Sequence, residues 1–332
     1  MKKLIKIVGL ALGVLLGIVA VGLIYFTVKY PDVDPAPSIT VERTPARIER
    51  GKYLANNVAV CMDCHSTRDW TLVSGPIVPG TEGKGGDRFD ESMGMPGTIY
   101  ARNITPAGIG DWTDGELYRA ITSGVSKDGR ALFPLMPYEA FSKLSDDDLY
   151  SIIAYIRTLK PIENEVSETK LNFPVNFLIK TAPKNRVPVT TVALHTSLER
   201  GKYLVNAASC ADCHTQAVEG KPVEGMEFAG GMTIPFPQGT IRTANITPDN
   251  ETGIGLWSKQ SFIARFKQYA DTSAYRINVD VAQYYTIMPW SMYSGMTEED
   301  LGAIYDYLQT QKPVNHHVEK FTPASQSSVA SK

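Results

Sequence analysis

The chain has 332 residues, of which 43% are hydrophobic, and its 33 Lys and Arg nearly balance its 35 Asp and Glu. This composition suits folded domains rather than disorder, and the length accommodates two domains of ordinary size. A formal net charge of -2 at pH 7 gives no reason to expect nucleic acid or another polyanion as a partner.

The first 29 residues predict a membrane-spanning helix. Three lysines within the first six residues precede an uncharged, mostly apolar run at residues 7–28, which ends at Lys29. As a helix this run would measure roughly 33 Å, enough to cross the roughly 30 Å hydrocarbon core of a bilayer once. A cleaved signal peptide is the alternative, but its apolar region is usually shorter and is followed by small residues, whereas Tyr30-Pro31-Asp32 follows here.

The charges that flank this helix predict its orientation. Because the lysines lie on its N-terminal side, the N-terminus is expected in the cytoplasm and everything after Tyr30 on the periplasmic side. We therefore expect a single-pass protein of the cytoplasmic (inner) membrane. No cysteine comes directly after the apolar run, so a lipid anchor in place of the helix is not supported.

The chain after the anchor contains an internal duplication. The sequence Glu-Arg-Gly-Lys-Tyr-Leu at residues 49–54 recurs unchanged at residues 199–204. Further motif pairs follow in the same order in both halves: Cys-x-x-Cys-His, Asn-Ile-Thr-Pro, Gly-Ile-Gly-x-Trp, and Met-Pro followed by Tyr or Trp. Two copies of one domain are therefore expected.

The duplication divides the chain into parts. They are a membrane anchor at 1–29, a proline-rich tether at 30–46, a first domain at 47–162, a linker at 163–193, a second domain at 194–320 and a disordered tail at 321–332. The prolines of the tether favour an extended conformation outside any packed core, and the tail is small and polar. In the linker, Phe173, Phe177, Leu178 and Ile179 either pack on a domain, which we favour, or dip toward the membrane surface.

Each domain is predicted to be all-α. Ser145 and Thr297 are good N-caps with acidic first turns, and apolar residues follow them at helical spacing. Further helices are expected before each Cys pair and after each Gly-Ile-Gly-x-Trp. No segment alternates convincingly enough to predict a sheet, so Gly- and Pro-rich loops, including residues 80–86, are expected to connect the helices.

All four cysteines lie in the two Cys-x-x-Cys-His motifs. These motifs supply Cys61, Cys64 and His65, and Cys210, Cys213 and His214. This is the signature of c-type haem attachment, in which the thiols bond the haem vinyl groups and the His ligates iron. Structural disulfides, a shared zinc site and a thioredoxin-like redox pair are alternatives, but each leaves both histidines unexplained. We therefore expect two covalently bound haem c groups.

Each iron of an electron-transfer haem needs a sixth ligand, and a Met thioether favours ferrous iron and raises the reduction potential. Met136 and Met288 lie 71 and 74 residues after their haem histidines, each followed by Pro and an aromatic residue. The predicted iron ligands are therefore His65 with Met136 and His214 with Met288.

Other ligands were weighed for both irons. Met95 is a rival in the first copy, but alignment of the two copies places Pro237 opposite it. His195, His316 and His317 have no counterparts in the first copy. We interpret them as surface or linker residues, with His195 an outside candidate for the second iron.

Two further pairs of residues recur. Trp112 and Trp257 either pack on a porphyrin edge and hydrogen-bond a propionate, or are core residues that start a helix. Asn103 and Asn245 stand in Asn-x-Thr sequons, but their recurrence in a duplicated loop favours a structural role in the haem pocket over glycan attachment.

Taken together, these motifs from about Arg47 to Lys320 resemble the multihaem cytochrome c subunits of membrane-bound bacterial alcohol, aldehyde and gluconate dehydrogenases. The resemblance implies a class I cytochrome c fold in each half, His/Met ligation of both irons, and electrons received from a periplasmic dehydrogenase. That family commonly carries three haem domains, whereas this chain has two attachment motifs and an N-terminal apolar helix.

The prediction is thus a membrane-anchored dihaem cytochrome c without catalytic residues of its own. The expected partners are an upstream dehydrogenase or quinol-oxidising complex, a downstream oxidase or soluble cytochrome c, and the membrane. The alternative is a dihaem enzyme such as a cytochrome c peroxidase or thiosulfate dehydrogenase, which needs one haem with an open or labile position. The near-symmetry of the halves argues against that division, and intact motifs argue against a structural subunit with vestigial haems.

Overall fold

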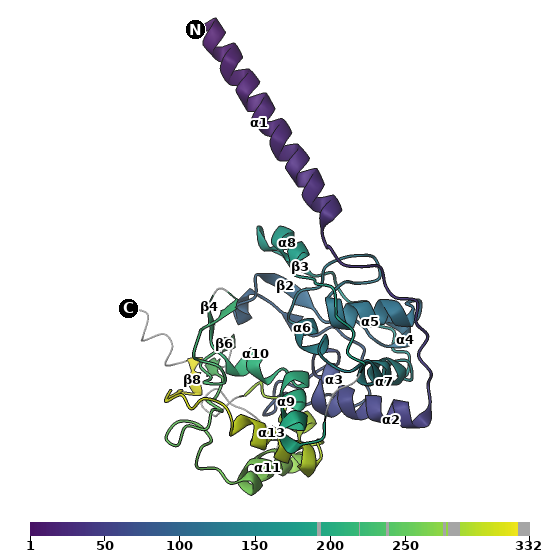
Figure 1. The fold of residues 1–332 in the computed structure, drawn as a ribbon, viewed down its shortest axis with the longest axis vertical. Coiled ribbons are helices and arrows are strands. Elements are labelled where there is room, and N and C mark those ends of the chain that lie inside the picture. Colours follow the sequence, from purple (N-terminus) through teal and green to yellow (C-terminus); the bar gives the residue numbers. More distant parts are fainter. Residues whose placement is uncertain (191–193, 219, 237–238, 275–276, 278–285, 325–332) are drawn as a thin grey trace.

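The structure is a computed structural model of the whole chain. It describes all residues except 191–193, 219, 237–238, 275–276, 278–285 and 325–332. A long helix projects from a body in which the two sequence repeats, residues 47–162 and 194–320, lie against one another (Figure 1).

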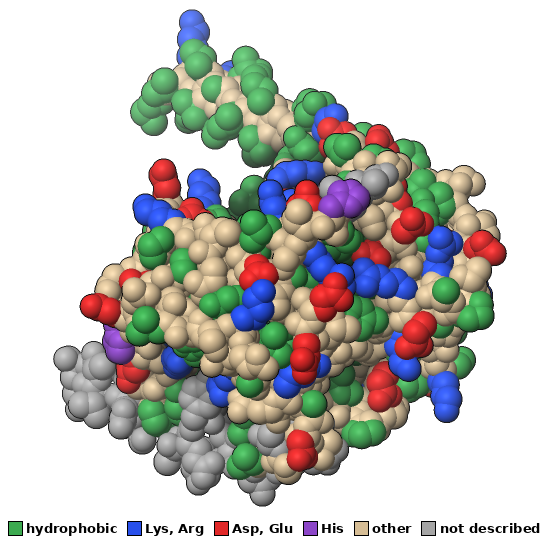
Figure 2. Space-filling view, turned by 60° about the horizontal axis from the view of Figure 1, so that its bottom comes forward, with side chains coloured by type: hydrophobic (Ala, Val, Ile, Leu, Met, Phe, Trp, Pro, Cys, Tyr) green, Lys and Arg blue, Asp and Glu red, His purple; other side chains and the backbone are tan. Residues whose placement is uncertain are grey.

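Helix α1, Lys2–Lys29, confirms the helix expected at the N-terminus. None of its residues is buried. Figure 2 shows it covered by hydrophobic side chains, whereas Lys, Arg, Asp and Glu side chains are mixed on the visible face of the body. Within the described residues it is the one helix long and apolar enough to cross a membrane. Its length and composition therefore suit one membrane crossing.

The proline-rich segment after α1 is extended but does not hang free. The backbone N–H of Val41 donates to Asp114 Oδ2 at 2.9 Å, and the Val41 side chain, 5% exposed, belongs to the hydrophobic core. A Cβ on Gly115 would lie 1.8 Å from the carbonyl oxygen of Pro37. The expectation of a tether outside any packed core is therefore wrong, because this segment is a strap on the first repeat.

The first repeat is built mainly of helices. They are α2 (Pro45–Tyr53), a π-helical turn η1 (Leu54–Val58), α3 (Cys61–Cys64), the 3-10 turn η2 (Glu91–Met93), α4 (Pro106–Ile109), α5 (Asp114–Ser123), α6 (Tyr138–Phe141) and α7 (Asp146–Ile156). The predicted N-cap of α7 is confirmed, since the Ser145 side chain accepts from the N–H of Asp148 at 3.1 Å.

The second repeat follows the same plan. Its helices are α9 (Ser197–Ala207), α10 (Cys210–His214), α11 (Lys259–Lys267), the 3-10 turns η4 (Gln268–Ala270) and η5 (Thr272–Ala274), α12 (Trp290–Tyr293) and α13 (Glu298–Leu308). Thr297 caps α13 as predicted, accepting from the N–H of Asp300 at 3.1 Å.

The first and last helices of each repeat cross at a glycine. A Cβ on Gly51 of α2 would lie 1.7 Å from the carbonyl oxygen of Ser151 in α7, and one on Gly201 of α9 would lie 1.9 Å from that of Ala303 in α13. A side chain at either position would force the helices apart. The crossing thus explains the glycine of the repeated hexapeptide.

Short strands contradict the expected all-α fold. The antiparallel sheets are β1 (Arg88–Phe89), β2 (Gly97–Tyr100) and β3 (Lys170–Leu171); β4 (Ala217–Val218) and β5 (Lys221–Pro222); and β6 (Thr233–Phe236), β7 (Gly239–Arg242) and β8 (Phe321–Pro323). The central strands β2 and β7 do alternate in burial, but four residues are too few for sequence periodicity to reveal.

The segments after the last helices are part of the folded body. The expected linker supplies β3, and the expected disordered tail supplies β8, so the tail prediction is wrong for residues 321–323. The rest of that prediction, at 325–332, and the end of the linker at 191–193 lie outside the described residues.

The linker also forms α8 (Val175–Leu178) and the 3-10 turn η3 (Ile179–Thr181). Phe177 stacks on Phe26 of α1, with ring centroids 3.9 Å apart, whereas Phe173 and Leu178 are exposed. The favoured interpretation, packing on a domain, is therefore wrong for Phe173 and Leu178, and Phe177 packs on α1; Ile179 is half-buried.

The repeats share one core and exchange hydrogen bonds. A single hydrophobic cluster contains buried residues of both, α6 packs on α9, and α12 packs on η1. The hydroxyl of Tyr53 donates to Asp300 and accepts from the N–H of Thr297 at 3.2 Å. Reciprocally, Tyr203 donates to Asp148 at 2.6 Å and accepts from the N–H of the α7 N-cap at 3.1 Å. Each repeat therefore caps the last helix of the other.

Candidate haem sites

The two attachment motifs occupy equivalent short helices, α3 and α10. Each follows a residue forced into the left-handed region, Val60 at φ 43° and Ser209 at φ 52°, which turns the chain sharply between the preceding helix and the first cysteine. All four cysteines are free thiols. Burial raises the pKa of Cys61 and of Cys210 to about 12, so both sulfurs are thiols rather than thiolates at neutral pH.

The alternatives to haem find no support in the geometry. The cysteines form no disulfide, and the described residues contain no group of three or more His, Cys, Asp or Glu that could hold a metal ion. A zinc site shared between the motifs would need such a group.

Both haem histidines are oriented by the same contact. His65 Nδ1–H donates to the carbonyl of Arg102 at 2.7 Å, and His214 Nδ1–H donates to that of Ala244 at 2.7 Å. This bond fixes the tautomer and leaves Nε2 as the lone-pair nitrogen, as a ligating His requires. Burial lowers the pKa of both imidazoles, which favours the neutral form that binds iron.

A glycine lies directly against the residue that supplies each orienting carbonyl. Gly85 N–H donates to the His65 carbonyl at 2.8 Å, and Gly230 N–H donates to the His214 carbonyl at 2.7 Å. Both glycines have φ near +70°, and a Cβ on either would lie 2.4 Å from the carbonyl carbon of Arg102 or Ala244. Our sequence analysis treated residues 80–86 as a plain loop; the recurrence of Gly-Gly at 85–86 and 230–231 was the available signal.

The repeated asparagines have the structural role that was predicted. Asn103 Oδ1 accepts from the N–H and hydroxyl of Thr105 at 2.9 and 2.7 Å, and Asn245 Oδ1 makes the same bonds to Thr247 at the same distances. Their amide nitrogens donate to carbonyls beyond α7 and α13, both at 2.8 Å. Because both side chains are more than 90% buried, they lock the loop that carries the orienting carbonyl.

The predicted methionine ligands stand in identical turns. Pro137 has φ -78° and ψ 59°, and Pro289 has φ -78° and ψ 62°, the values of an inverse γ-turn. Across each turn the carbonyl of Met136 or Met288 accepts from the N–H two residues later at 2.7 Å. Both methionines are partly buried and pack against the shared core, as do Cys61 and Cys210.

The other ligand candidates lie elsewhere. Met95 precedes β2, and Pro237, its counterpart in the alignment, lies outside the described residues. His195 and His317 are exposed, as expected of surface residues. His316 Nδ1–H donates to the carbonyl of Ala229 at 2.9 Å, a contact that ties the segment after α13 to the sheet side of the second repeat.

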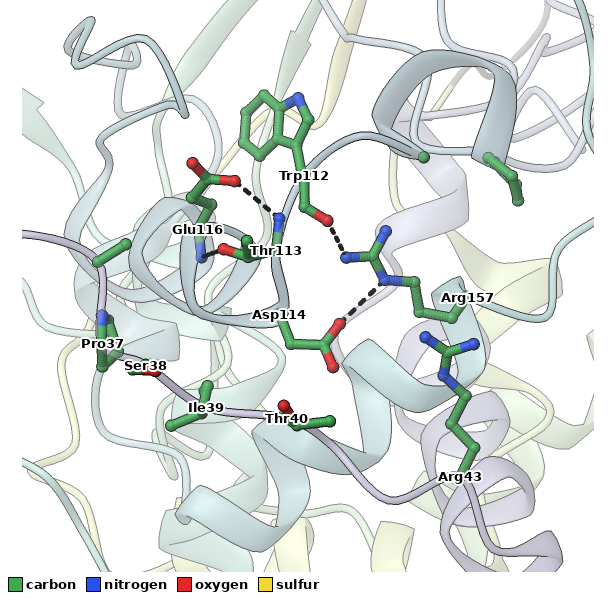
Figure 3. A pocket seen from close by; sticks show the side chains of 13 residues that line it. Pro37, Ser38, Ile39, Thr40, Arg43, Trp112, Thr113, Asp114, Glu116 and Arg157 are labelled. Carbon is green, nitrogen blue, oxygen red and sulfur yellow. Dashed lines mark hydrogen bonds and ion pairs between the residues drawn. The ribbon is translucent and has the colours of Figure 1, made fainter.

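The repeated tryptophans are not equivalent. Trp257 is 38% exposed, so it is no core residue, whereas Trp112 lines a cavity of ≈ 760 Å³ between the strap and α5. Figure 3 shows the ion pair beside this cavity, in which Arg157 Nε meets Asp114 Oδ1 at 3.0 Å, and the bond from Arg157 to the Trp112 carbonyl. A further nitrogen of Arg157 donates to the carbonyl of Ile109 at 3.0 Å. None of the cavity's lining residues belongs to the haem motifs.

The two attachment motifs converge at the boundary between the repeats. Tyr293 of α12 is buried, and its pKa is raised well above the usual value by burial and, to a smaller extent, by groups of both motifs: Cys210, Cys213, Asp63 and Cys64. Met292, from the same helix, packs against Met62 of the first motif. A helix of the second repeat thus borders both motifs.

A second contact links the first motif to the second methionine turn. Arg68 forms a buried ion pair with Asp63 at 2.7 Å, and its guanidinium donates to the carbonyl of Ser74 at 2.7 Å. The Ser74 hydroxyl donates to the carbonyl of Met288 and accepts from the N–H of Trp290 at 3.2 Å.

A buried donor in the second repeat fits a bound haem. Trp290 Nε1, two residues after Met288, has no hydrogen-bond partner in the described part of the chain. Buried donors without acceptors are costly, and a haem brings acceptor oxygens in its propionates. The residues present therefore fit the group that the motif predicts.

Comparisons with known proteins agree with the geometry. Residues 198–312, which contain the second motif and Met288, match the cytochrome c family, and a cytochrome c domain implies covalently bound haem c. Similar proteins include the fructose dehydrogenase cytochrome subunit of Gluconobacter japonicus, 33% identical over 68% of this chain and 46% of that protein. The cytochrome c subunit of alcohol dehydrogenase (quinone) from Gluconobacter oxydans is 29% identical over 81% of this chain and 55% of its own length.

A diheme cytochrome c-type protein of Cereibacter sphaeroides is 29% identical over 57% of this chain and 63% of its own length. The chain spans about half the length of the dehydrogenase cytochrome subunits that it matches. The chain therefore belongs to the cytochrome c family and is a homologue of the cytochrome subunits of fructose, alcohol and gluconate dehydrogenases.

Proposed function

We propose that this protein is a membrane-anchored dihaem cytochrome c that relays electrons between redox partners. The observation that carries the proposal is the pairing of two equivalent sites: each motif has the same His–carbonyl bond and the same Met-Pro turn, and both motifs border α12. Two redox groups that border the same helix can pass an electron from one to the other.

Each repeat would hold one haem. Cys61 and Cys64 would bond the first haem and Cys210 and Cys213 the second, with His65 and Met136, and His214 and Met288, as the axial ligands. When bound, haem c supplies a one-electron Fe(III)/Fe(II) couple. The chain's own residues fix the histidine tautomer and hold the methionine turn, so each iron would have two protein ligands and neither would offer a site for substrate.

The domains proposed here are longer than the predicted ones. The predicted class I cytochrome c domains, 47–162 and 194–320, account for the equivalent helices. The first domain also includes the strap at 30–46 and β3. The second ends with β8 rather than before it.

The setting proposed is the periplasmic face of the inner membrane. Helix α1 would cross the bilayer once with its lysine-rich end in the cytoplasm. The names of the relatives point to a dehydrogenase or quinol-oxidising complex as donor, with an oxidase or soluble cytochrome c as acceptor. An anchor raises the effective concentration of the relay near such membrane partners.

The test is haem content and ligation in the detergent-purified protein. We expect two haems per chain and no spectral change when carbon monoxide is added to the reduced form. Met136→Leu and Met288→Leu should each make about half of the haem bind carbon monoxide, because each variant frees one iron. Met95→Leu is the matched control and should leave both haems unreactive.

Carbon monoxide binding by half of the haem in the unmodified protein would overturn the proposal. It would show an open iron, as an enzyme such as a peroxidase or thiosulfate dehydrogenase requires. One haem per chain would refute the relay directly.

A further inference from the structure

The linker carries apolar side chains that the body leaves uncovered. Phe173 is 84% exposed and Leu178 is 53% exposed, and both belong to the short stretch around α8. A lone exposed apolar side chain needs no explanation, but these two large ones and the ring of Phe177, next to Leu178 in the chain, form a small patch.

The loop that presents this patch is fixed at both ends. Before it, β3 pairs with β2, and the N–H of Asn172 donates to the carbonyl of Pro96 at 2.9 Å. After it, the Arg186 side chain is 3% exposed and pairs with Asp146 at 2.5 Å, and Asn185 accepts from the N–H of Asp34 at 2.7 Å. The patch is thus held out from the body by backbone and ionic contacts.

The position of the patch along α1 determines how deep it would lie in the bilayer that α1 is proposed to span. Phe177 stacks on Phe26 at 3.9 Å between ring centroids, and α8 lies beside the C-terminal end of α1 (Figure 1). Phe26 lies within the apolar run, three residues before Lys29, and is therefore about 4.5 Å deeper along the helix axis. If Lys29 sits among the headgroups, a ring stacked on Phe26 must lie at the boundary with the hydrocarbon.

We propose that residues 173–179 insert into the periplasmic interface of the bilayer that α1 spans, so that the body contacts lipid at a second point. Aromatic side chains favour this zone, and Lys180, which follows directly, places a cation at headgroup level. The inference rests on the proposed anchoring by α1. Two attachments, unlike one, fix the tilt of the body and thus which face of the relay meets a membrane partner.

The test measures depth with spin labels on single introduced cysteines, since the native cysteines are consumed by haem. The full-length, haem-loaded protein is placed in phospholipid nanodiscs, and collisions with oxygen and with a water-soluble nickel complex are compared. Labels are placed at Phe173→Cys, at Leu15→Cys in the middle of α1, and at Leu256→Cys. Leu256 is 78% exposed and precedes α11, which lies far from α1 (Figure 1).

The proposal expects oxygen-dominated collisions at positions 15 and 173 and nickel-dominated collisions at 256, with a several-fold difference in the ratio between 173 and 256. A lipid value at 15 with a water value at 173 would overturn the inference and leave the anchor intact. Water values at both would refute the anchor, and the inference with it. Phe173→Asp, combined with a label at Leu178→Cys, should move that label toward the water value, whereas no change there would also count against insertion.

Discussion

Removing the hydroxyl of Ser74 should weaken the binding of Met288, the proposed methionine ligand of the second haem, although Ser74 belongs to the first repeat. Ser74 bonds both sides of the turn that carries Met288: it donates to the Met288 carbonyl and accepts from the N–H of Trp290. The residue is 1% exposed, so water does not replace these bonds. We therefore expect Ser74→Ala to destabilise the ligating position of this turn.

The expected size follows from the two lost hydrogen bonds. Each is worth roughly 0.5–1.5 kcal/mol, so the pair contributes about 1–3 kcal/mol. The Trp290 N–H keeps its bond to the Met288 carbonyl at 2.7 Å, which limits the loss to this range. At about 1.4 kcal/mol per factor of ten, the fraction of second haem without its methionine should rise about 5- to 150-fold.

The assay is imidazole binding to the oxidised protein, because imidazole competes with methionine for the iron. We expect the apparent affinity of about half of the haem to rise by this factor while the other half stays unchanged. Ser142→Ala is the control, since the Ser142 hydroxyl bonds only to the nearby carbonyl of Glu139 on an exposed surface. Unchanged imidazole affinity in Ser74→Ala, or a rise that persists when Met288 is already Leu, would refute the reasoning.

Three further predictions concern stability and are checked by urea unfolding followed by circular dichroism. Gly201→Ala should cost roughly 1–3 kcal/mol or more because its Cβ would lie 1.9 Å from a carbonyl oxygen, whereas Gly302→Ala, whose nearest neighbour is 3.4 Å away, should be tolerated; equal effects would contradict the crossing. Burial raises the pKa of Asp87 to about 6, so the folded state loses stability as the pH rises from the unfolded pKa of about 3.9 to about 6, and Asp87→Asn should add roughly 1–3 kcal/mol at neutral pH but little near pH 4. Tyr203→Phe removes a buried bond between the repeats and should cost roughly 1–3 kcal/mol; a neutral effect would mean that the repeats do not need this contact.

The elements that recur in sequence were the ones that could be predicted. The N-caps Ser145 and Thr297, the helices before the two Cys pairs, and the structural role of Asn103 and Asn245 all follow from local chemistry that repeats in both halves. Duplication acts as an internal alignment, because a residue that must serve the same contact twice appears twice. The same reasoning predicts Met136 and Met288 as iron ligands; their turns have matching backbone angles, and their ligation stays a prediction.

The strands could not be predicted because their partners are remote. β2 and β7 have four residues each, and their outer partners β3 and β8 lie beyond the last helix of each repeat. A short strand is stabilised by its neighbours rather than by its own pattern. For the same reason composition alone made the strap, the linker and the tail look unstructured, although Val41 is buried and residues 321–323 are paired.

The repeated hexapeptide shows why the two halves act as one unit. Its arginines work within their own repeat, since Arg50 pairs with Asp148 at 2.8 Å and Arg200 with Asp300 at 2.5 Å. Its tyrosines work across the boundary and bond the same two carboxylates, which are 8% and 1% exposed. Each buried carboxylate thus pairs with an arginine from its own repeat and a tyrosine from the other. Separating the two repeats would therefore remove the tyrosine hydrogen bond from both carboxylates. The spacing between the two attachment motifs is therefore set by the interface and does not depend on the linker, as a relay with a constant transfer rate requires.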